Sequence, residues 1–234
     1  MATTMKGIIG GGTMFSAKRA RLKPYFEVIG GSPYYSEYWD DRNLVEKVST
    51  TDNGVTTVHL KESPTTLINL CSDCSGLMAF KATNLSFYHV EDMGHMFYGC
   101  YNITDINFEG FEAPNVKYVD SMFGGCERLT NIKGLNYLFR NTSKLKSTNY
   151  MFCFCPLETI DLSNIDTSNV ENMAGMFSLC RCLTTIRGIL DMKSCTKYTD
   201  MFDSCISLSG VKIKNPPVGF DGAGLSSSQY TIVS

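Results

Sequence analysis

Residues 176–189 read MFSLCRCLTTIRGI, and near copies of this stretch recur along the chain. They begin at Met96, Met122, Met151 and Met201, and a degenerate first copy begins at Leu70. The aligned cysteines are separated in order by 26, 26, 29, 25 and 25 residues. The chain therefore contains an internal repeat with a period near 25 residues. The aligned cysteines are Cys74, Cys100, Cys126, Cys155, Cys180 and Cys205.

Each repeat is predicted to hold a short helix, a turn at the cysteine and a short strand. Apolar residues precede the Met-Phe pair at steps that are typical of one helix face. Ser168, with Glu171 three residues later, forms a capping box, and Ser63-Pro64 is typical of a helix start. After the cysteine, the pattern LxxIxL alternates at its end, which indicates a strand.

Units of this size cannot bury an apolar face alone, so they must stack into a solenoid. A period near 25 lies in the range of leucine-rich repeats, roughly 20 to 29 residues. The sequence thus predicts a leucine-rich-repeat-like solenoid of about six repeats over residues 63–213, each a short helix plus a short strand. The three extra residues around Asn141 are expected in a loop.

The two ends depart from the repeat. Residues 1–62 are predicted to form a mostly β N-terminal module that anchors and caps the solenoid. Within it, Asn53-Gly54 lies between stretches rich in Val and Thr, which predicts a β-hairpin that covers the open end of the solenoid sheet. Residues 214–234 are predicted to be a C-terminal cap, with a final strand from Gln229 to Val233.

The repeat resembles the BspA-like leucine-rich repeats. Their hallmark is MFxxCxxLxxIxL followed by a segment such as DLSNIDTSNVENM, which is the text of residues 161–173. The resemblance covers residues 63–213. That family occurs in bacterial surface and adhesin-like proteins and in proteins of phages and phage-tail-like particles of gut bacteria. The resemblance implies binding and brings no catalytic residue set with it.

Composition narrows the classes of function. With 234 residues, 43% of them hydrophobic, the chain can bury a sizeable core. Its 21 basic and 23 acidic side chains give a net charge of −2, which argues against a general nucleic-acid binder. No stretch approaches the roughly 18 to 20 apolar residues of a membrane span, and no charged segment precedes a long apolar one at the N-terminus. We expect an unsecreted chain without nucleic-acid partners or a membrane span.

No catalytic, cofactor or metal site is predicted. Cys71 and Cys74 have half of a zinc-site spacing, but no second pair follows, and a core position explains them. An enzyme such as a glycan hydrolase needs paired carboxylates, whereas Asp105 falls on a different repeat from Glu158 and Asp161 and the three form no convergent motif. The regular spacing of the cysteines predicts reduced thiols that pack in the core.

A ligand stripe is predicted on the strands. The apolar letters of LxxIxL point inward, so the residue between the last two points outward, one for each repeat. One interpretation of such a stripe is a solvated face. The other is a shallow binding surface for an anionic cell-wall polymer or an acidic partner, in which several weak contacts together give the affinity. Its residues are Lys81, Asn107, Lys133, Asp161, Arg187 and Lys212.

Assembly contacts are predicted in the N-terminal module, which holds a basic run and an aromatic cluster. There are alternatives to assembly contacts. The basic run is then a solvated arm or a weak nucleic-acid contact, and the aromatic cluster is then part of the local core or a flat surface on which sugar rings stack. The residues are Lys18, Arg19, Arg21, Lys23, Tyr34, Tyr35, Tyr38 and Trp39.

Together these features predict a non-catalytic structural and interaction protein of a phage or phage-tail-like particle, made in the bacterial cytoplasm. The N-terminal module would dock to the particle, and the solenoid would display a recognition or decoration surface, with tail or baseplate favoured over head. The expected partners are other particle proteins, copies of this chain, and a host surface glycan or protein. The alternative is a bacterial cell-surface adhesin-type binding module, which needs an export route.

Overall fold

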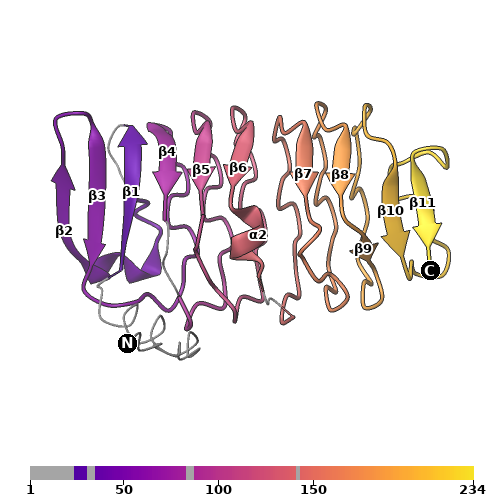
Figure 1. Ribbon diagram of the computed structural model, residues 1–234, viewed down its shortest axis with the longest axis horizontal. Coiled ribbons are helices and arrows are strands. Elements are labelled where there is room, and N and C mark those ends of the chain that lie inside the picture. Colours follow the sequence, from indigo (N-terminus) through magenta and orange to yellow (C-terminus); the bar gives the residue numbers. More distant parts are fainter. Residues whose placement is uncertain (1–23, 31–34, 83–86, 141–142) are drawn as a thin grey trace, which may run out of the picture.

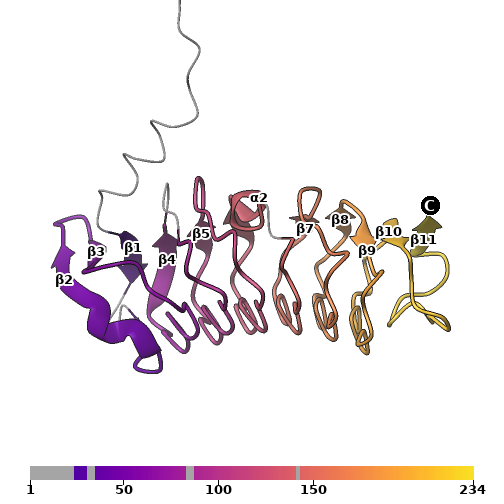
Figure 2. The same ribbon diagram turned by 90° about the horizontal axis from the view of Figure 1, so that it is seen from below.

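The chain folds into an elongated β-solenoid. The structure is a computed structural model that describes residues 24–30, 35–82, 87–140 and 143–234. Its strands lie side by side along the long axis (Figure 1). Figure 2 shows these strands along one long side and a row of turns along the opposite side. We call these the strand side and the turn side.

Three sheets make up the strand side. The largest has the order β2-β3-β1-β4-β5-β6, in which β4, β5 and β6 are parallel and β1 is antiparallel to both β3 and β4. Next along the axis are the pair β7-β8 and the sheet β11-β10-β9, both parallel. The strands are β1 Tyr25–Gly30, β2 Val45–Thr50, β3 Val55–Leu60, β4 Leu77–Lys81, β5 Asp105–Asn107, β6 Asn131–Lys133, β7 Thr159–Asp161, β8 Thr185–Arg187, β9 Leu190–Asp191, β10 Val211–Lys214 and β11 Tyr230–Val233. The helical elements of the described residues are the 3-10 helix η1 Asp40–Leu44 and the short helix α2 Leu135–Leu138.

The predicted helix of each repeat is wrong, because the segment from methionine to cysteine consists of β-turns. The Tyr98 N–H donates to the His95 carbonyl and the Cys100 N–H to that of Phe97, bonds that close turns of four residues. His95 has φ of 56° and Gly99 has φ of 68°, values that an α-helix does not allow. The other repeats have positive φ at the equivalent positions. The solenoid is therefore not of the helix-plus-strand leucine-rich-repeat form.

The two predicted helix starts are also turns. The Ser168 backbone N–H donates to Asp166 Oδ1 at 3.0 Å rather than capping a helix. The Glu171 carboxylate lies 2.8 Å from Lys146 Nζ of the preceding repeat, so it is not the second half of a capping box. Ser63-Pro64 likewise precedes turns.

A stack of phenylalanine rings forms the centre of the core. Neighbouring ring centroids are 5.5 to 5.8 Å apart, and the ring planes lie within 10° of parallel. The backbones of successive turns are joined beside the rings, as where the Phe123 N–H donates to the Met151 carbonyl at 2.9 Å. The stack and this hydrogen-bond ladder together set the spacing of the repeats. The five stacked residues are Phe97, Phe123, Phe152, Phe177 and Phe202, all fully buried.

The repeat cysteines line the core next to this stack. From the second repeat on, each Sγ donates a hydrogen bond at 2.9 to 3.2 Å to a backbone carbonyl of the preceding turn. All ten cysteines of the chain are reduced, and nine of them are buried while Cys182 is exposed. The donating cysteines are Cys100, Cys126, Cys155, Cys180 and Cys205.

Thiol labelling tests this arrangement. In the native protein near neutral pH we expect one thiol, that of Cys182, to react quickly with an alkylating reagent. Burial raises the pKa of the others, to about 12 at Cys126 and Cys205, so they stay protonated and unreactive. After unfolding without reductant, mass spectrometry should count all ten. A lower count would reveal disulfides and contradict the core described above.

The N-terminal elements extend the solenoid sheet. The predicted hairpin is present as β2 and β3, with Gly54 at φ 79° in the turn. It does not contact the first repeat strand directly, because β1 lies between β3 and β4. At the other end, β11 pairs with β10 in parallel, which confirms the predicted final strand.

The strand side is interrupted between β6 and β7. No pairing joins these two strands in the described part of the chain, although the turn side continues past them. There the Ser121 N–H donates to the Asn149 carbonyl at 2.7 Å, and the Gly125 N–H donates to that of Cys153 at 2.9 Å. The longest repeat lies here and contains α2, while residues 141–142 of its predicted loop lie outside the described residues.

Candidate functional site: an aromatic groove on the turn side

A groove of about 430 Å³ crosses three successive repeats on the turn side. Its floor comes from the middle repeat and contains Ser121, Gly124 and Gly125. Exposed rings border it on both sides, with Tyr98 and Tyr101 from the preceding repeat, and Tyr150 and Phe154 from the following one. His95, Gly99, Glu127 and Cys153 complete the lining. We call this site the aromatic groove.

Two of its rings lie over glycines of the next repeat. A Cβ on Gly124 would stand 3.2 Å from Cδ2 of Tyr98, and one on Gly175 would stand 2.2 Å from Cε1 of Tyr150. A side chain at Gly175 would thus overlap the Tyr150 ring. The glycines let both rings lean in the same direction along the solenoid axis.

Two of the aromatic residues have an unfavourable backbone conformation. Phe154 has φ of 63° and Tyr150 has φ of 51°, although their side chains are 52% and 40% exposed. The two preceding repeats have Gly99 and Gly125 at the position of Phe154. The left-handed region costs a non-glycine residue about 1 to 2 kcal/mol, and an exposed ring recovers little of that by packing. The turn geometry imposes positive φ at this position, since Asp73, Leu179 and Ser204 share it, and Phe154 is the member of this set that places an exposed aromatic ring in the groove.

The electrostatics of the groove do not suit anions. Glu127 places an exposed carboxylate at its border, and no lysine or arginine is among the described lining residues. A negatively charged ligand would meet a like charge without a compensating cation. The groove is suited to binding through ring faces and neutral polar groups.

The aromatic groove is not among the sites predicted from the sequence. The sequence feature that could indicate this groove is the pair of variable residues in MFxxC. The pair is Tyr-Gly in the second repeat, Gly-Gly in the third and Cys-Phe in the fourth. A pair of small residues between two aromatic neighbours marks a depression only if successive turns align in register. The alignment of successive turns follows from the turn geometry and cannot be derived from the residue types alone.

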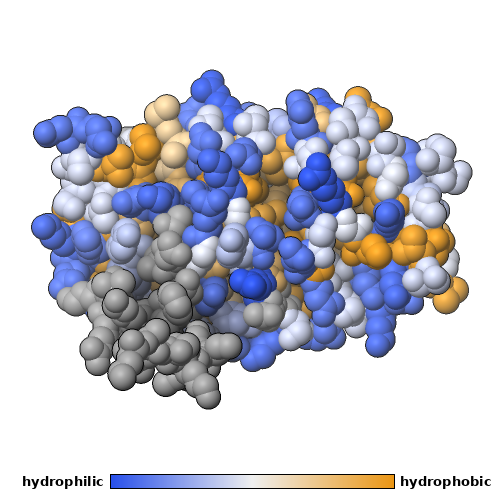
Figure 3. All heavy atoms as spheres, in the orientation of Figure 1, coloured by the Kyte–Doolittle hydropathy of each residue, from blue (hydrophilic) through white to orange (hydrophobic). Residues whose placement is uncertain are grey.

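The predicted ligand stripe is on the strand side. All its members are exposed except Asn107, which is half-buried. The register places Lys81, Asn107 and Lys133 side by side, and Asp161 beside Arg187. Figure 3, in the orientation of Figure 1, shows polar residues spread over this face with hydrophobic ones between them.

The stripe is not a continuous row of free cations. The interruption between β6 and β7 separates Lys133 from Asp161. Lys81 Nζ lies 2.9 Å from Glu27 Oε2 of β1, and this hydrogen bond raises the pKa of Lys81. Ligand binding by the remaining cations, among them Lys212 on β10, stays a prediction.

The predicted assembly contacts are dispersed. Tyr38 is 59% exposed and stays a candidate. Trp39 is fully buried and its Nε1–H donates to the Thr66 carbonyl at 3.0 Å, so its assignment as an assembly contact is wrong. The half-buried Tyr35 packs against it, with ring centroids 6.2 Å apart. Lys18, Arg19, Arg21, Lys23 and Tyr34 lie outside the described residues.

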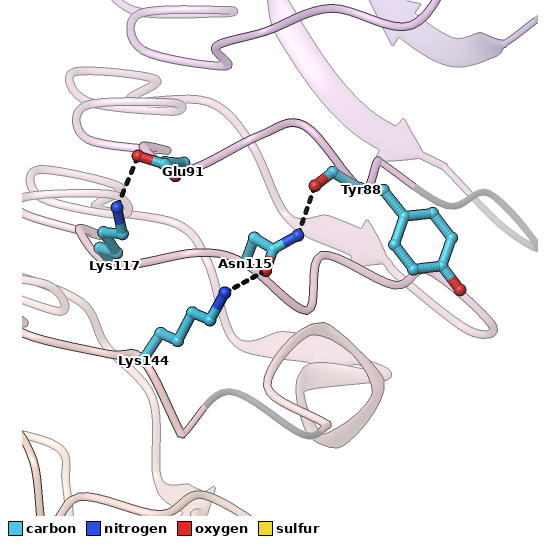
Figure 4. A network of polar contacts seen from close by, with 5 residues as sticks. All are labelled: Tyr88, Glu91, Asn115, Lys117 and Lys144. Atoms are coloured by element: carbon cyan, nitrogen blue, oxygen red, sulfur yellow. Dashed lines mark hydrogen bonds and ion pairs between the residues drawn. The ribbon is translucent and has the colours of Figure 1, made fainter.

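A further polar region links repeats at the start of the turns (Figure 4). Lys117 Nζ lies 2.7 Å from Glu91 Oε2, and this contact lowers the pKa of Glu91. Asn115 Nδ2 donates to the Tyr88 carbonyl at 2.6 Å and its Oδ1 accepts from Lys144 Nζ at 2.7 Å. These groups satisfy one another, and exposed ion pairs contribute little to stability. We interpret the region as a structural link between repeats.

The stacked turns, the shared core and the repeat ladder define the chain as a β-solenoid repeat protein. Residues 67–215 match the family described as Mycoplasma protein of unknown function, DUF285, and the chain belongs to this family. The family is related to the BspA-type repeat proteins. Comparisons with curated proteins and with solved structures gave no match. Among the described residues, no helix has the length and apolar character needed to cross a bilayer, and no group of three or more His, Cys, Asp or Glu side chains is placed to hold a metal ion.

Proposed function

We propose that this chain is a non-catalytic interaction protein, a rod that holds a recognition surface away from its point of attachment. The observation that carries this proposal is the aromatic groove, which is bordered by the exposed rings of Tyr98, Tyr101, Tyr150 and Phe154. Exposed aromatic rings around a concave site are typical of binding surfaces. The continuous core supports these rings along the rod.

The N-terminal end is the proposed attachment point. Strands β1 to β3 continue the solenoid sheet, and the basic run precedes them in the chain. A force applied at this end would therefore be carried to the first repeats through hydrogen-bonded strands. The proposed setting is a phage or phage-tail-like particle, with tail or baseplate favoured over head, and its support is the resemblance of the repeats.

A bacterial cell-surface adhesin-type binding module is the second candidate. Its support is the relation of the family to the BspA-type repeat proteins, whose resemblance implies bacterial surface and adhesin-like proteins. In this setting the same groove would face neighbouring cells or host surfaces.

Fractionation of the producing strain tests the proposed setting. We expect the full chain to travel with particles in a density gradient, and a variant without residues 1–23 to be absent from that fraction. This deletion keeps β1, whereas loss of residues 1–62 would uncover the β4 edge. An unchanged melting temperature of the shortened chain is the control for folding. Recovery of both chains with the cell envelope would contradict the particle and support the adhesin-type module.

A further inference from the structure

We propose that the aromatic groove binds a neutral sugar chain, whose pyranose rings lie along the solenoid axis on the tyrosine and phenylalanine rings. This inference rests on the proposed binding function and gives it a ligand class. It concerns the turn side, not the predicted stripe on the strand side.

The rings form a row rather than a cage. Tyr98 lies over Gly124 in the third repeat, and Tyr150 lies over Gly175 in the fifth. Both tyrosine rings lean in the same direction, so they remain offset along the axis by two repeats. Neighbouring rings of the phenylalanine stack beneath them are 5.5 to 5.8 Å apart. A row of separate ring faces fits a chain of rings, whereas a single compact cation needs rings that converge on one point.

The polar groups match a sugar as well. A pyranose ring has an apolar face of C–H groups and a rim of hydroxyls, so it needs flat apolar surface beside hydrogen-bonding groups. The tyrosines supply both at once. Ser121 in the floor and Glu127 at the border add a hydroxyl and a carboxylate that accept from sugar hydroxyls. The absence of lysine and arginine among the described lining residues selects a neutral chain over an acidic one.

A peptide is the less favoured occupant. Peptides in grooves commonly bind through main-chain hydrogen bonds. The backbone donors of the floor already serve the solenoid, since Ser121 N–H donates to Asn149, Gly124 N–H to Ser121 and Gly125 N–H to Cys153. An extended peptide would find none of these donors free.

The experiment measures binding of the full chain to four probes by titration calorimetry. Two are neutral, the N-acetylglucosamine tetramer and maltotetraose, one is the acidic tetrasaccharide of hyaluronan, and one is a proline-rich decapeptide. We expect at least one neutral tetrasaccharide to bind and the acidic one not to bind. In Phe154→Gly, affinity should fall at least tenfold while the melting temperature stays level or rises, because glycine relieves the left-handed backbone.

Leu179→Gly is the matched control. Leu179 has φ of 62° one repeat beyond Phe154, and it is not among the lining residues. Its replacement should raise or retain the melting temperature and leave affinity unchanged. The double variant Lys133→Glu and Arg187→Glu on the strand side should also bind normally.

Each other outcome overturns the inference. Binding of the acidic probe that is lost in the double charge variant would assign the ligand to the stripe. Preference for the peptide would replace the sugar by a protein partner and leave the proposed binding function standing. If neither neutral probe binds, the sugar assignment fails, while the gradient experiment still decides the proposed setting.

Discussion

Phe152→Ala is expected to lower the free energy of unfolding by about 3 to 5 kcal/mol, the usual effect of removing a buried aromatic ring. Phe152 is fully buried between Phe123 and Phe177, with ring centroids at 5.5 and 5.7 Å. The change would leave a cavity and break the ring stack at its centre. Because each repeat contacts only its neighbours, no other part of the chain can replace these contacts.

Urea unfolding followed by circular dichroism measures this loss. The matched control is Phe154→Ala, two residues away, whose ring is 52% exposed. We expect the control to change the free energy of unfolding by no more than about 0.5 kcal/mol, as is usual for surface positions. A loss below about 1 kcal/mol in Phe152→Ala would show that the stack does not stabilise the solenoid.

Stability is expected to fall steeply above about pH 8.5, where the thiols of an unfolded chain ionise. In the folded chain, burial raises the pKa of the cysteines that bond to the preceding turn, to about 12 at Cys126 and Cys205. The folded state therefore binds more protons than the unfolded state in this range, so the free energy of unfolding decreases as pH rises. Each such thiol contributes a loss of about 1.4 kcal/mol per pH unit until its folded pKa is reached.

Five such thiols give a combined loss of several kcal/mol between pH 9 and 10. Urea unfolding under reducing conditions at stepped pH measures the slope. Cys126→Ala should reduce the slope by about one proton, whereas Cys182→Ala should leave it unchanged because that thiol is exposed. A free energy of unfolding that is level from pH 8 to 10 would contradict burial of these thiols.

The repeat and its stacking could be predicted from the sequence, but its turn geometry could not. Val90, Met93 and Met96 follow one another at steps of three. Such steps suit a helix face, but a helix of 3.6 residues per turn also needs steps of four. Successive β-turns advance by three residues each, as where the Met96 N–H donates to the Met93 carbonyl. Histidine is enriched at positive φ, but a single histidine such as His95 does not by itself predict this conformation.

The ligand stripe could be predicted from the sequence, whereas the aromatic groove could not. The outward direction of Lys133 and Arg187 follows from strand alternation, which the sequence shows directly. The aromatic groove depends on how Tyr98 and Tyr150 lean across a neighbouring repeat, and on glycines that are distant in the sequence. Such relations arise only after the repeats stack in register.

The interruption between β6 and β7 gives the rod a preferred direction of bending. On the turn side, the bonds from Ser121 to Asn149 and from Gly125 to Cys153 act as a hinge line of nearly fixed length. On the strand side, no strand pairing joins β6 to β7 in the described residues, so we expect that side to lengthen at lower cost. Bending there makes the turn side concave and brings Tyr98 closer to Phe154 across the groove floor. Curvature of the rod and width of the aromatic groove are thus mechanically coupled.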